Sequence, residues 1–126
     1  MSAIEKLRMD EPVRLDPDRL VILYAELGQL AAERLIAAAM EDIAVQMVAV
    51  QLAAQERRAD VVMRGAAEMA DLSQQVGMVL LAKVARDLEA CAARRDRVSQ
   101  AAVLARLLRI GERSLTAVWD LQDMRV

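Results

Sequence analysis

One cysteine and no histidine limit the covalent chemistry that this chain can perform. Cys91 is the only thiol in the sequence. It continues an apolar stripe that Leu81, Val84 and Leu88 form at helical spacing. A reactive thiolate needs an exposed, electropositive setting, and no histidine can activate this one. We therefore expect Cys91 to be a small buried hydrophobe, and a lone cysteine without a disulfide agrees with a reducing cytoplasm.

Carboxylates are the remaining side chains that could hold a metal ion or transfer protons. Acids that lie close together within the long predicted helices include Glu41 with Asp42, and Asp87 with Glu89. Their positions fall outside the apolar stripes, so they are expected to face solvent. Metal sites in helical bundles use Glu-x-x-His pairs, which a chain without histidine cannot supply. The glycines are isolated and form no phosphate loop. The sequence therefore predicts no catalytic, cofactor-binding or metal-binding residue, and an enzyme is disfavoured.

The composition indicates one helical domain without a strong charge. Apolar residues make up 56% of the 126 residues, with 4 Gly, 2 Pro and no Phe. The formal net charge is −2, and one Trp and one Tyr offer little stacking surface, so nucleic-acid binding is disfavoured. The longest uncharged run, residues 43–55, is shorter than the roughly 20 apolar residues that span a bilayer. A cytoplasmic protein without a membrane segment is expected.

Helix signals divide the chain into a loose N-terminal arm, residues 1–16, and a single helical domain, residues 17–126. Asp16 can cap a helix, and the proline that follows it suits the first helical position. Asp60 is expected to cap the third helix in the same way. Glycines and short charged turns separate the later helices. The predicted helices cover residues 17–27, 29–56, 61–75, 78–93 and 98–121.

Apolar residues recur at steps of three and four along each long segment, which is typical of helices that share one core. Four such helices joined by short polar turns predict an all-α fold, an antiparallel up-and-down four-helix bundle. The short first helix would cover one end of that bundle. Trp119, near the C-terminus, is expected to close the bottom of the core, whereas an exposed Trp119 would be a candidate contact anchor.

The segment expected to form the second helix has more apolar surface than one core stripe requires. Beside its core stripe, a second stripe is formed by Val45, Val48 and Leu52. Either other helices surround this segment, or the second stripe is a subunit interface. These three residues are therefore candidates for self-association, as in a homodimer.

The third and fourth predicted helices, AAEMADLSQQVG followed by MVLLAKVARDLEACAARRD, resemble the histidine-phosphotransfer domain family. Members of that family carry a four-helix bundle, the motif Ala-His-x-Leu-Lys-Gly-Ser and a glycine about ten residues after the histidine. Ala66 matches the alanine of the motif, Met69 is similar to its leucine, and Gly77 falls at the position of the later glycine. The following helix is matched by Leu81, Leu88 and Glu89, and the resemblance spans about residues 29–115.

Departures from the motif remove the chemistry of the family. Ala67 stands where the phosphorylated histidine would be, Ala70 where the lysine would be, and Asp71 where the glycine would be. An alanine methyl group cannot accept a phosphoryl group, and a chain without histidine cannot supply the acceptor from elsewhere. The resemblance therefore implies a signalling module that binds a two-component partner without passing phosphate.

The resemblance also implies where a partner would dock. Family members contact a response-regulator receiver or a histidine kinase through the helix of the histidine and its neighbour. The candidate interface residues on the matching helix are Arg64, Ala67, Glu68, Asp71, Gln74 and Gln75. The alternative that the sequence leaves open is a structural or homodimeric helical-bundle interaction protein unrelated to phosphorelay.

Overall fold

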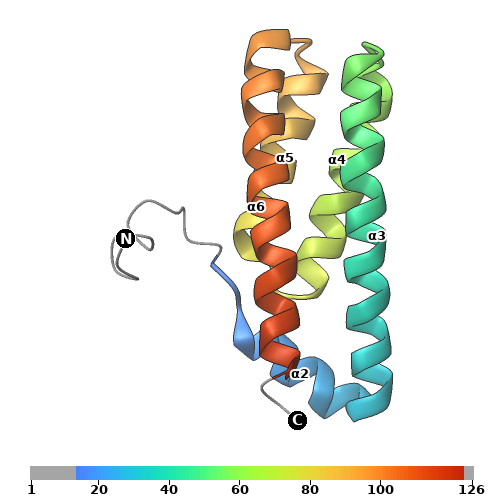
Figure 1. Cartoon of the computed structure of the whole chain (residues 1–126), viewed down its shortest axis with the longest axis vertical. Helices are drawn as coiled ribbons and strands as arrows, with labels where there is room; N and C mark the ends of the chain where they lie inside the picture. Colours follow the sequence, from blue (N-terminus) through green and yellow to red (C-terminus); the bar gives the residue numbers. More distant parts are fainter. Residues whose placement is uncertain (1–13, 124–126) are drawn as a thin grey trace.

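The computed structural model describes residues 14–123, and all of the regular structure in that range is helical, which confirms the all-α class. A single β-bridge joins Leu15 and Met78. The helix bounds lie within about two residues of those predicted from the sequence. The helices are α2 (Pro17–Leu27), α3 (Gln29–Gln55), α4 (Ala59–Gln75), α5 (Val79–Ala93) and α6 (Arg97–Asp123) (Figure 1).

The four long helices, α3 to α6, run alternately in opposite directions, and a short turn joins each to the next (Figure 1). Each packs mainly against its neighbour in the sequence: α3 against α4, α4 against α5, and α5 against α6. Contact between α3 and α6 is much sparser. The side of the molecule between α3 and α6 is therefore its most open side.

Helix length explains the position of α2. α3 and α6 have 27 residues each, whereas α4 has 17 and α5 has 15. At 1.5 Å per residue, α3 and α6 are roughly 15–18 Å longer than the pair between them. α2 lies at the end where α4 and α5 stop short, and it packs there against α3 (Figure 1). Its buried residues, Leu20 and Leu23, join the core at that end.

The start of α2 is attached to the turn between α4 and α5. Asp16 caps α2, since its carboxylate accepts a hydrogen bond from the backbone N–H of Asp18 at 3.1 Å. The backbone N–H of Asp16 in turn donates to the carbonyl oxygen of Gly77 at 2.8 Å. Residues 14–16 of the expected loose arm are thus held against the α4–α5 turn, and residues 1–13 lie outside the described part of the chain.

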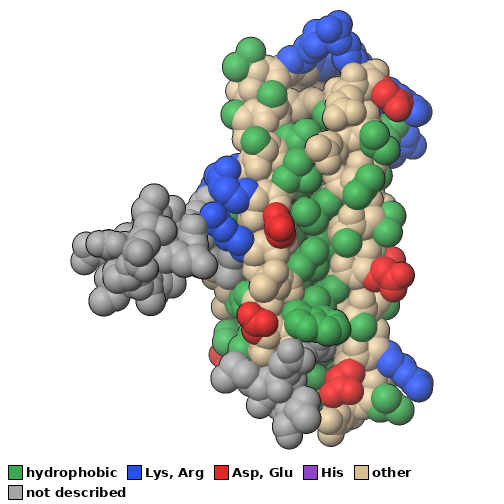
Figure 2. Space-filling view, in the orientation of Figure 1, with side chains coloured by type: hydrophobic (Ala, Val, Ile, Leu, Met, Phe, Trp, Pro, Cys, Tyr) green, Lys and Arg blue, Asp and Glu red, His purple; other side chains and the backbone are tan. Residues whose placement is uncertain are grey.

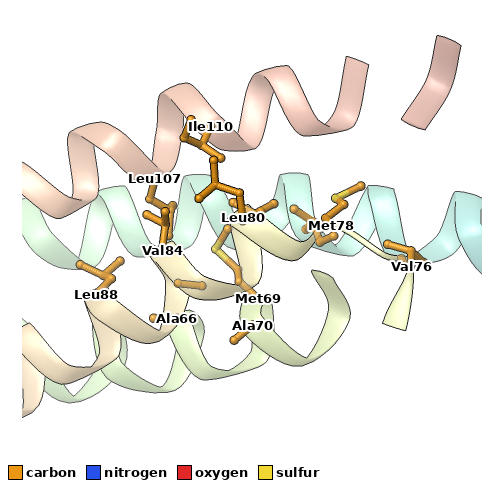
Figure 3. Packing of buried hydrophobic residues seen from close by; sticks show 14 of the residues in the cluster. Ala66, Met69, Ala70, Val76, Met78, Leu80, Val84, Leu88, Leu107 and Ile110 are labelled. Atoms are coloured by element: carbon orange, nitrogen blue, oxygen red, sulfur yellow. The ribbon is translucent and has the colours of Figure 1, made fainter. Parts of the chain in front are cut away.

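The core is formed by side chains from all of the long helices. Figure 3 shows Leu80 and Val84 of α5 between Met69 of α4 on one side and Leu107 and Ile110 of α6 on the other. All five side chains are buried. The predicted α5 stripe is buried as well, including Cys91. The buried residues that α3 contributes are Ala32, Ile36, Ala39, Ile43, Val50 and Ala53.

The prediction for Trp119 is wrong. Its side chain is 57% exposed, whereas the adjacent Val118 is fully buried. The buried face of α6 runs through Leu107, Ile110 and Val118. Successive residues of a helix are about 100° apart around its axis, so a residue one position past the centre of this face turns outward.

The prediction that Asp60 caps α4 is also wrong. Arg57 has a φ of 58°, and the turn that it forms is closed by a 2.9 Å hydrogen bond from the backbone N–H of Arg58 to the carbonyl oxygen of Ala53. This compact ending of α3 lets α4 begin earlier, directly after Arg58 and without a side-chain cap. Asp60 therefore lies in the first turn of α4, where it pairs with Arg64 at 3.6 Å.

Candidate partner-binding surface on α4 and α5

The six candidate interface residues share the outer face of α4. The opposite face is buried and contains small residues, among them Gly65, Ala66 and Ala70. Ala67 is half-buried because it lies between that buried face and the outer one. The other five candidates, Arg64, Glu68, Asp71, Gln74 and Gln75, are exposed.

A close approach of α3 fixes the position of this face. A Cβ atom at Gly65 would lie 2.6 Å from Cγ1 of Val50, a fully buried side chain of α3. Only glycine permits that distance between the helices. The outer face of α4 is therefore held on a rigid support and not on a loop.

Two of the candidate acids are oriented by neighbouring helices. Glu68 accepts a hydrogen bond from Nε2 of Gln46 on α3 at 3.0 Å. Asp71 pairs with Nη2 of Arg86 on α5 at 2.5 Å. Arg86 also donates to Glu89 at 3.1 Å, and this hydrogen bond together with the charge of Asp71 raises the pKa of the Arg86 guanidinium. The pairs are exposed, so their effect is to position charge and not to stabilise the fold appreciably.

Three of the candidates, Asp71, Gln74 and Gln75, line a surface cleft of about 750 Å³. The cleft lies where α4, α5 and the start of α2 meet. Arg19 of α2 reaches across it, and its Nε donates to the carbonyl oxygen of Gln75 at 3.0 Å. The other charged groups that line the cleft are Asp16, Lys83 and Arg86. Arg64, Ala67 and Glu68 lie farther along α4, outside this lining.

Sequence reasoning missed the basic side of the cleft. Arg19, Lys83 and Arg86 come from two other helices, and no pattern within the third predicted helix points to them. The one signal available was the spacing of Lys83 and Arg86, which puts both on one face of α5. Three cations and two carboxylates meet in the cleft, so it can form hydrogen bonds and ion pairs with a polar partner.

The described residues bring no further reactive groups to this surface. Cys91 is buried in α5, where its sulfur accepts a hydrogen bond from Arg94 at 3.5 Å. Among residues 14–123, no group of three His, Cys, Asp or Glu side chains is placed to hold a metal ion. The surface is thus built from charged and amide side chains around a small methyl group at position 67.

The candidate self-association residues lie on a different surface, along α3. Val45, Val48 and Leu52 are 59%, 58% and 51% exposed, so the described helices do not cover them. By length and composition alone, α3 could also cross a membrane: an 18-residue window within it has a mean hydropathy of 1.6. Core helices of soluble proteins pass the same test, but only 22% of this window is buried. Part of the apolar surface of α3 is therefore left uncovered.

Comparison with known proteins gives no relative for this chain. No protein-family model matches it, and no curated protein and no solved structure matches it either. The resemblance to histidine-phosphotransfer domains stays a prediction from the sequence.

Proposed function

We propose that this chain is a non-catalytic, histidine-phosphotransfer-like signalling module. It binds a two-component partner, a response-regulator receiver or a histidine kinase, without passing phosphate. The observation that supports the proposal most directly is the environment of position 67. A methyl group replaces the phosphoryl acceptor there, while Glu68 and Asp71 beside it are held in place by α3 and α5. Charges held beside a small, inert side chain support docking without a group that could be phosphorylated.

The proposal includes the finer architecture. α3 to α6 are an antiparallel up-and-down four-helix bundle, and α2 is its covering helix. The alternating helix directions, the short turns and the position of α2 support this (Figure 1). A cytoplasmic location is also part of the proposal, and the single cysteine is in keeping with it.

Docking takes place on the pair α4 and α5, which make the most extensive contacts of any two helices in the described chain. A rigid pair lets a partner bind without first ordering the surface, so less binding free energy is lost. The small side chain of Ala67 leaves room for a helix of the partner to approach. The cations Arg19, Lys83 and Arg86 at the cleft then meet acidic side chains of that partner, which makes the association rate fall as salt rises.

Two charge-introducing variants, Ala67→Arg and Asp71→Arg, test this interface. The tagged chain is crosslinked in a lysate of its source organism, and captured proteins are identified by mass spectrometry. We expect the wild type to capture a receiver or a kinase and both variants to lose it. Leu30→Arg, at an apolar position that is 60% exposed at the start of α3, is the matched control and should retain the partner.

A capture that contains neither a receiver nor a kinase would reject the signalling role. Equal capture of a receiver by the wild type and both variants would reject the interface and keep the role. Circular dichroism of each variant shows whether the helices are intact. Incubation of the wild-type chain with the captured kinase and labelled ATP should leave no acid-labile phosphate on it.

A further inference from the structure

A continuous groove separates α3 from α6 on the open side of the molecule. It consists of two hollows of about 390 and 400 Å³. Gln51 of α3 and Leu108 of α6 line both hollows, so they mark the centre of the groove. Figure 2 shows hydrophobic side chains along this groove, between the two helices that face the viewer. We call it the α3–α6 groove.

The two halves of the groove differ in shape. In the first half, Val48 stands 58% exposed on α3, and Leu115 lines the floor from α6. In the second half, the positions that lie equally far from Gln51 and Leu108 on the other side carry small residues, Ala54 on α3 and Ala101 on α6. At these positions the first half presents larger apolar side chains and the second half presents alanines, beside Leu104 of α6.

The two ends of this face also differ in charge. Arg57, Arg58 and Arg97 lie at the end formed by the α3–α4 and α5–α6 turns, where Figure 2 shows basic side chains gathered. The acids of these two turns are Glu56, which lies 4.0 Å from Arg58, and Asp96, which accepts hydrogen bonds from Ser99. Toward the other end, Glu112 lines the first hollow, and the exposed acids include Glu41 on α3 and Asp120 on α6.

We propose that the α3–α6 groove binds a second copy of this chain, face to face and antiparallel, about a two-fold axis that passes at Gln51 and Leu108. This two-fold rotation reverses the direction of each helix. A residue that precedes Gln51 or Leu108 in one copy therefore lies opposite a residue that follows it in the other copy. A two-fold contact of this kind uses each interaction twice. The proposal does not depend on a signalling partner, because that partner is placed on α4 and α5.

Helix geometry shows which residues this axis brings together. Val48 and Ala54 each lie about 4.5 Å from Gln51 along α3, on opposite sides of it. Leu115 and Ala101 each lie about 10.5 Å from Leu108 along α6, again on opposite sides. The larger residues of one copy therefore fall over the alanines of the other, and the hollows are filled as knobs fill holes.

The same axis pairs opposite charges. Arg97 lies about 16.5 Å from Leu108, and Trp119 and Asp120 lie about 16.5 and 18 Å from it on the other side. Arg97 of one copy thus meets Asp120 of the other, beside the exposed ring of Trp119. A parallel face-to-face pair would instead set Arg97 near Arg57 of the other copy, and Asp120 near Glu41. Like charges at both ends disfavour the parallel pair.

Two apolar-face variants test whether the groove is the interface. Sedimentation equilibrium of the full chain should show a dimer at micromolar concentration. Val48→Glu should raise the dimer dissociation constant at least about tenfold, because it sets a charge against an apolar hollow. Val21→Glu, at a 52% exposed position on α2, should leave the constant unchanged. Circular dichroism of both variants reports whether α3 and α2 remain helical.

Charge reversal tests the antiparallel direction. Arg97→Glu and Asp120→Arg should each weaken the dimer, and the double variant should restore it to within about threefold of the wild type. A parallel dimer predicts the opposite, since each single reversal would relieve a repulsion. Strengthening by either single reversal, or no recovery in the double variant, overturns the proposal.

Other occupants of the groove give distinct results. A chain that stays monomeric up to about 100 μM, or a dimer that Val48→Glu leaves intact, overturns the proposal. Flotation with vesicles of phosphatidylcholine and phosphatidylglycerol tests the membrane alternative for α3. A monomer that floats with these vesicles, and loses that binding through Val48→Glu, would assign the apolar face to a lipid surface instead.

Discussion

α3 contacts α4 on one side and α6 on the other, and these two interfaces are filled to very different extents. Toward α4, the position of a Cβ atom on Gly65 would be 2.6 Å from Val50, which is fully buried. Toward α6, a Cβ atom on Gly111 would meet the sulfur of Met47 at 2.8 Å, yet open hollows remain beside it. One helix therefore takes part in both a closed interface and an open one.

The difference follows from the residues that face each neighbour. A β-branched valine packed against the backbone of a glycine has little room to move, so the α3–α4 interface is complete within the chain. Methionine, glutamine and alanine face α6, and a flexible thioether adapts its shape. The closed α3–α4 interface holds the outer face of α4 in place. The open α3–α6 interface is itself a surface for another molecule.

The largest expected effect comes from a leucine-to-alanine pair that compares the packed core with the open side. Leu81→Ala should lower the free energy of unfolding by about 2–5 kcal/mol, because it leaves a cavity among fully buried side chains. Leu52→Ala, on the exposed stripe of α3, should change it by about 0.5 kcal/mol or less. Urea denaturation at one protein concentration measures both. Equal losses would mean that the stripe on α3 is covered in solution.

Gly77→Ala and Gly28→Ala separate backbone strain from packing. Both glycines have positive φ, 78° and 82°, so alanine is strained at each position. Gly28 also has a ψ of 165°, in a region that is essentially restricted to glycine, so alanine there costs about 1–3 kcal/mol. At Gly77 a Cβ atom would in addition lie 2.7 Å from the carbonyl oxygen of Asp16, whereas nothing lies within 4 Å at Gly28. Both variants should therefore destabilise the fold, Gly28→Ala through strain alone and Gly77→Ala also through a clash. A loss of less than about 1 kcal/mol for Gly77→Ala in urea denaturation would show that the start of α2 moves aside easily.

A second glycine pair compares the two interfaces of α3 directly. Gly65→Ala should destabilise by about 1–3 kcal/mol, because a buried valine in a helix strongly prefers one rotamer and cannot readily turn away from the added methyl group. Gly111→Ala meets only the flexible end of Met47, and its gain in helix propensity of about 0.5–1 kcal/mol offsets the contact. Thermal melts of both variants measure the difference. A loss at position 111 as large as that at 65 would contradict an adaptable α3–α6 interface.

The smallest effect is expected at the turn that leads into α6. The carboxylate of Asp96 accepts hydrogen bonds from the hydroxyl and the backbone N–H of Ser99 at 2.7 and 3.1 Å, and these lower the pKa of Asp96 below its ordinary value. A lowered pKa stabilises the folded state at neutral pH, and that contribution is lost as the pH falls through the folded-state pKa. Asp96→Ala should thus lower the melting temperature at pH 7 and approach the wild type in acid.

The control for this last comparison is Asp96→Asn, which keeps an N-capping side chain but cannot titrate. Its melting temperature relative to Asp96→Ala should stay constant between pH 7 and acid. A wild-type advantage over Asp96→Ala that does not fall in acid would show that the carboxylate charge is not what stabilises the turn.

Helix positions could be predicted closely from the sequence because they depend on local signals. Asp16 with the proline after it, Gly28 and Gly77 mark ends that no distant contact overrides. The burial of Cys91 also followed from spacing within one helix. The class of fold was therefore accessible from periodicity and turn residues alone.

The rotation of α6 and the polar cleft could not be predicted in the same way. Trp119 is exposed because packing against α5 selects which of several apolar faces turns inward. The cleft joins Arg19 to Lys83 only because α2 folds back beneath α4 and α5. Both features depend on how helices are placed relative to one another, and a single sequence contains no direct signal for that.

The preference of each long helix for its neighbour in the sequence has a consequence for how quickly the chain folds. Contacts between consecutive helices close short loops, so the contact order is low, and folding is expected within microseconds to milliseconds. During synthesis, α3, α4 and α5 can assemble before α6 leaves the ribosome. The sparse contact between α3 and α6 then forms last, so the apolar side of α3 is the final surface to gain a partner.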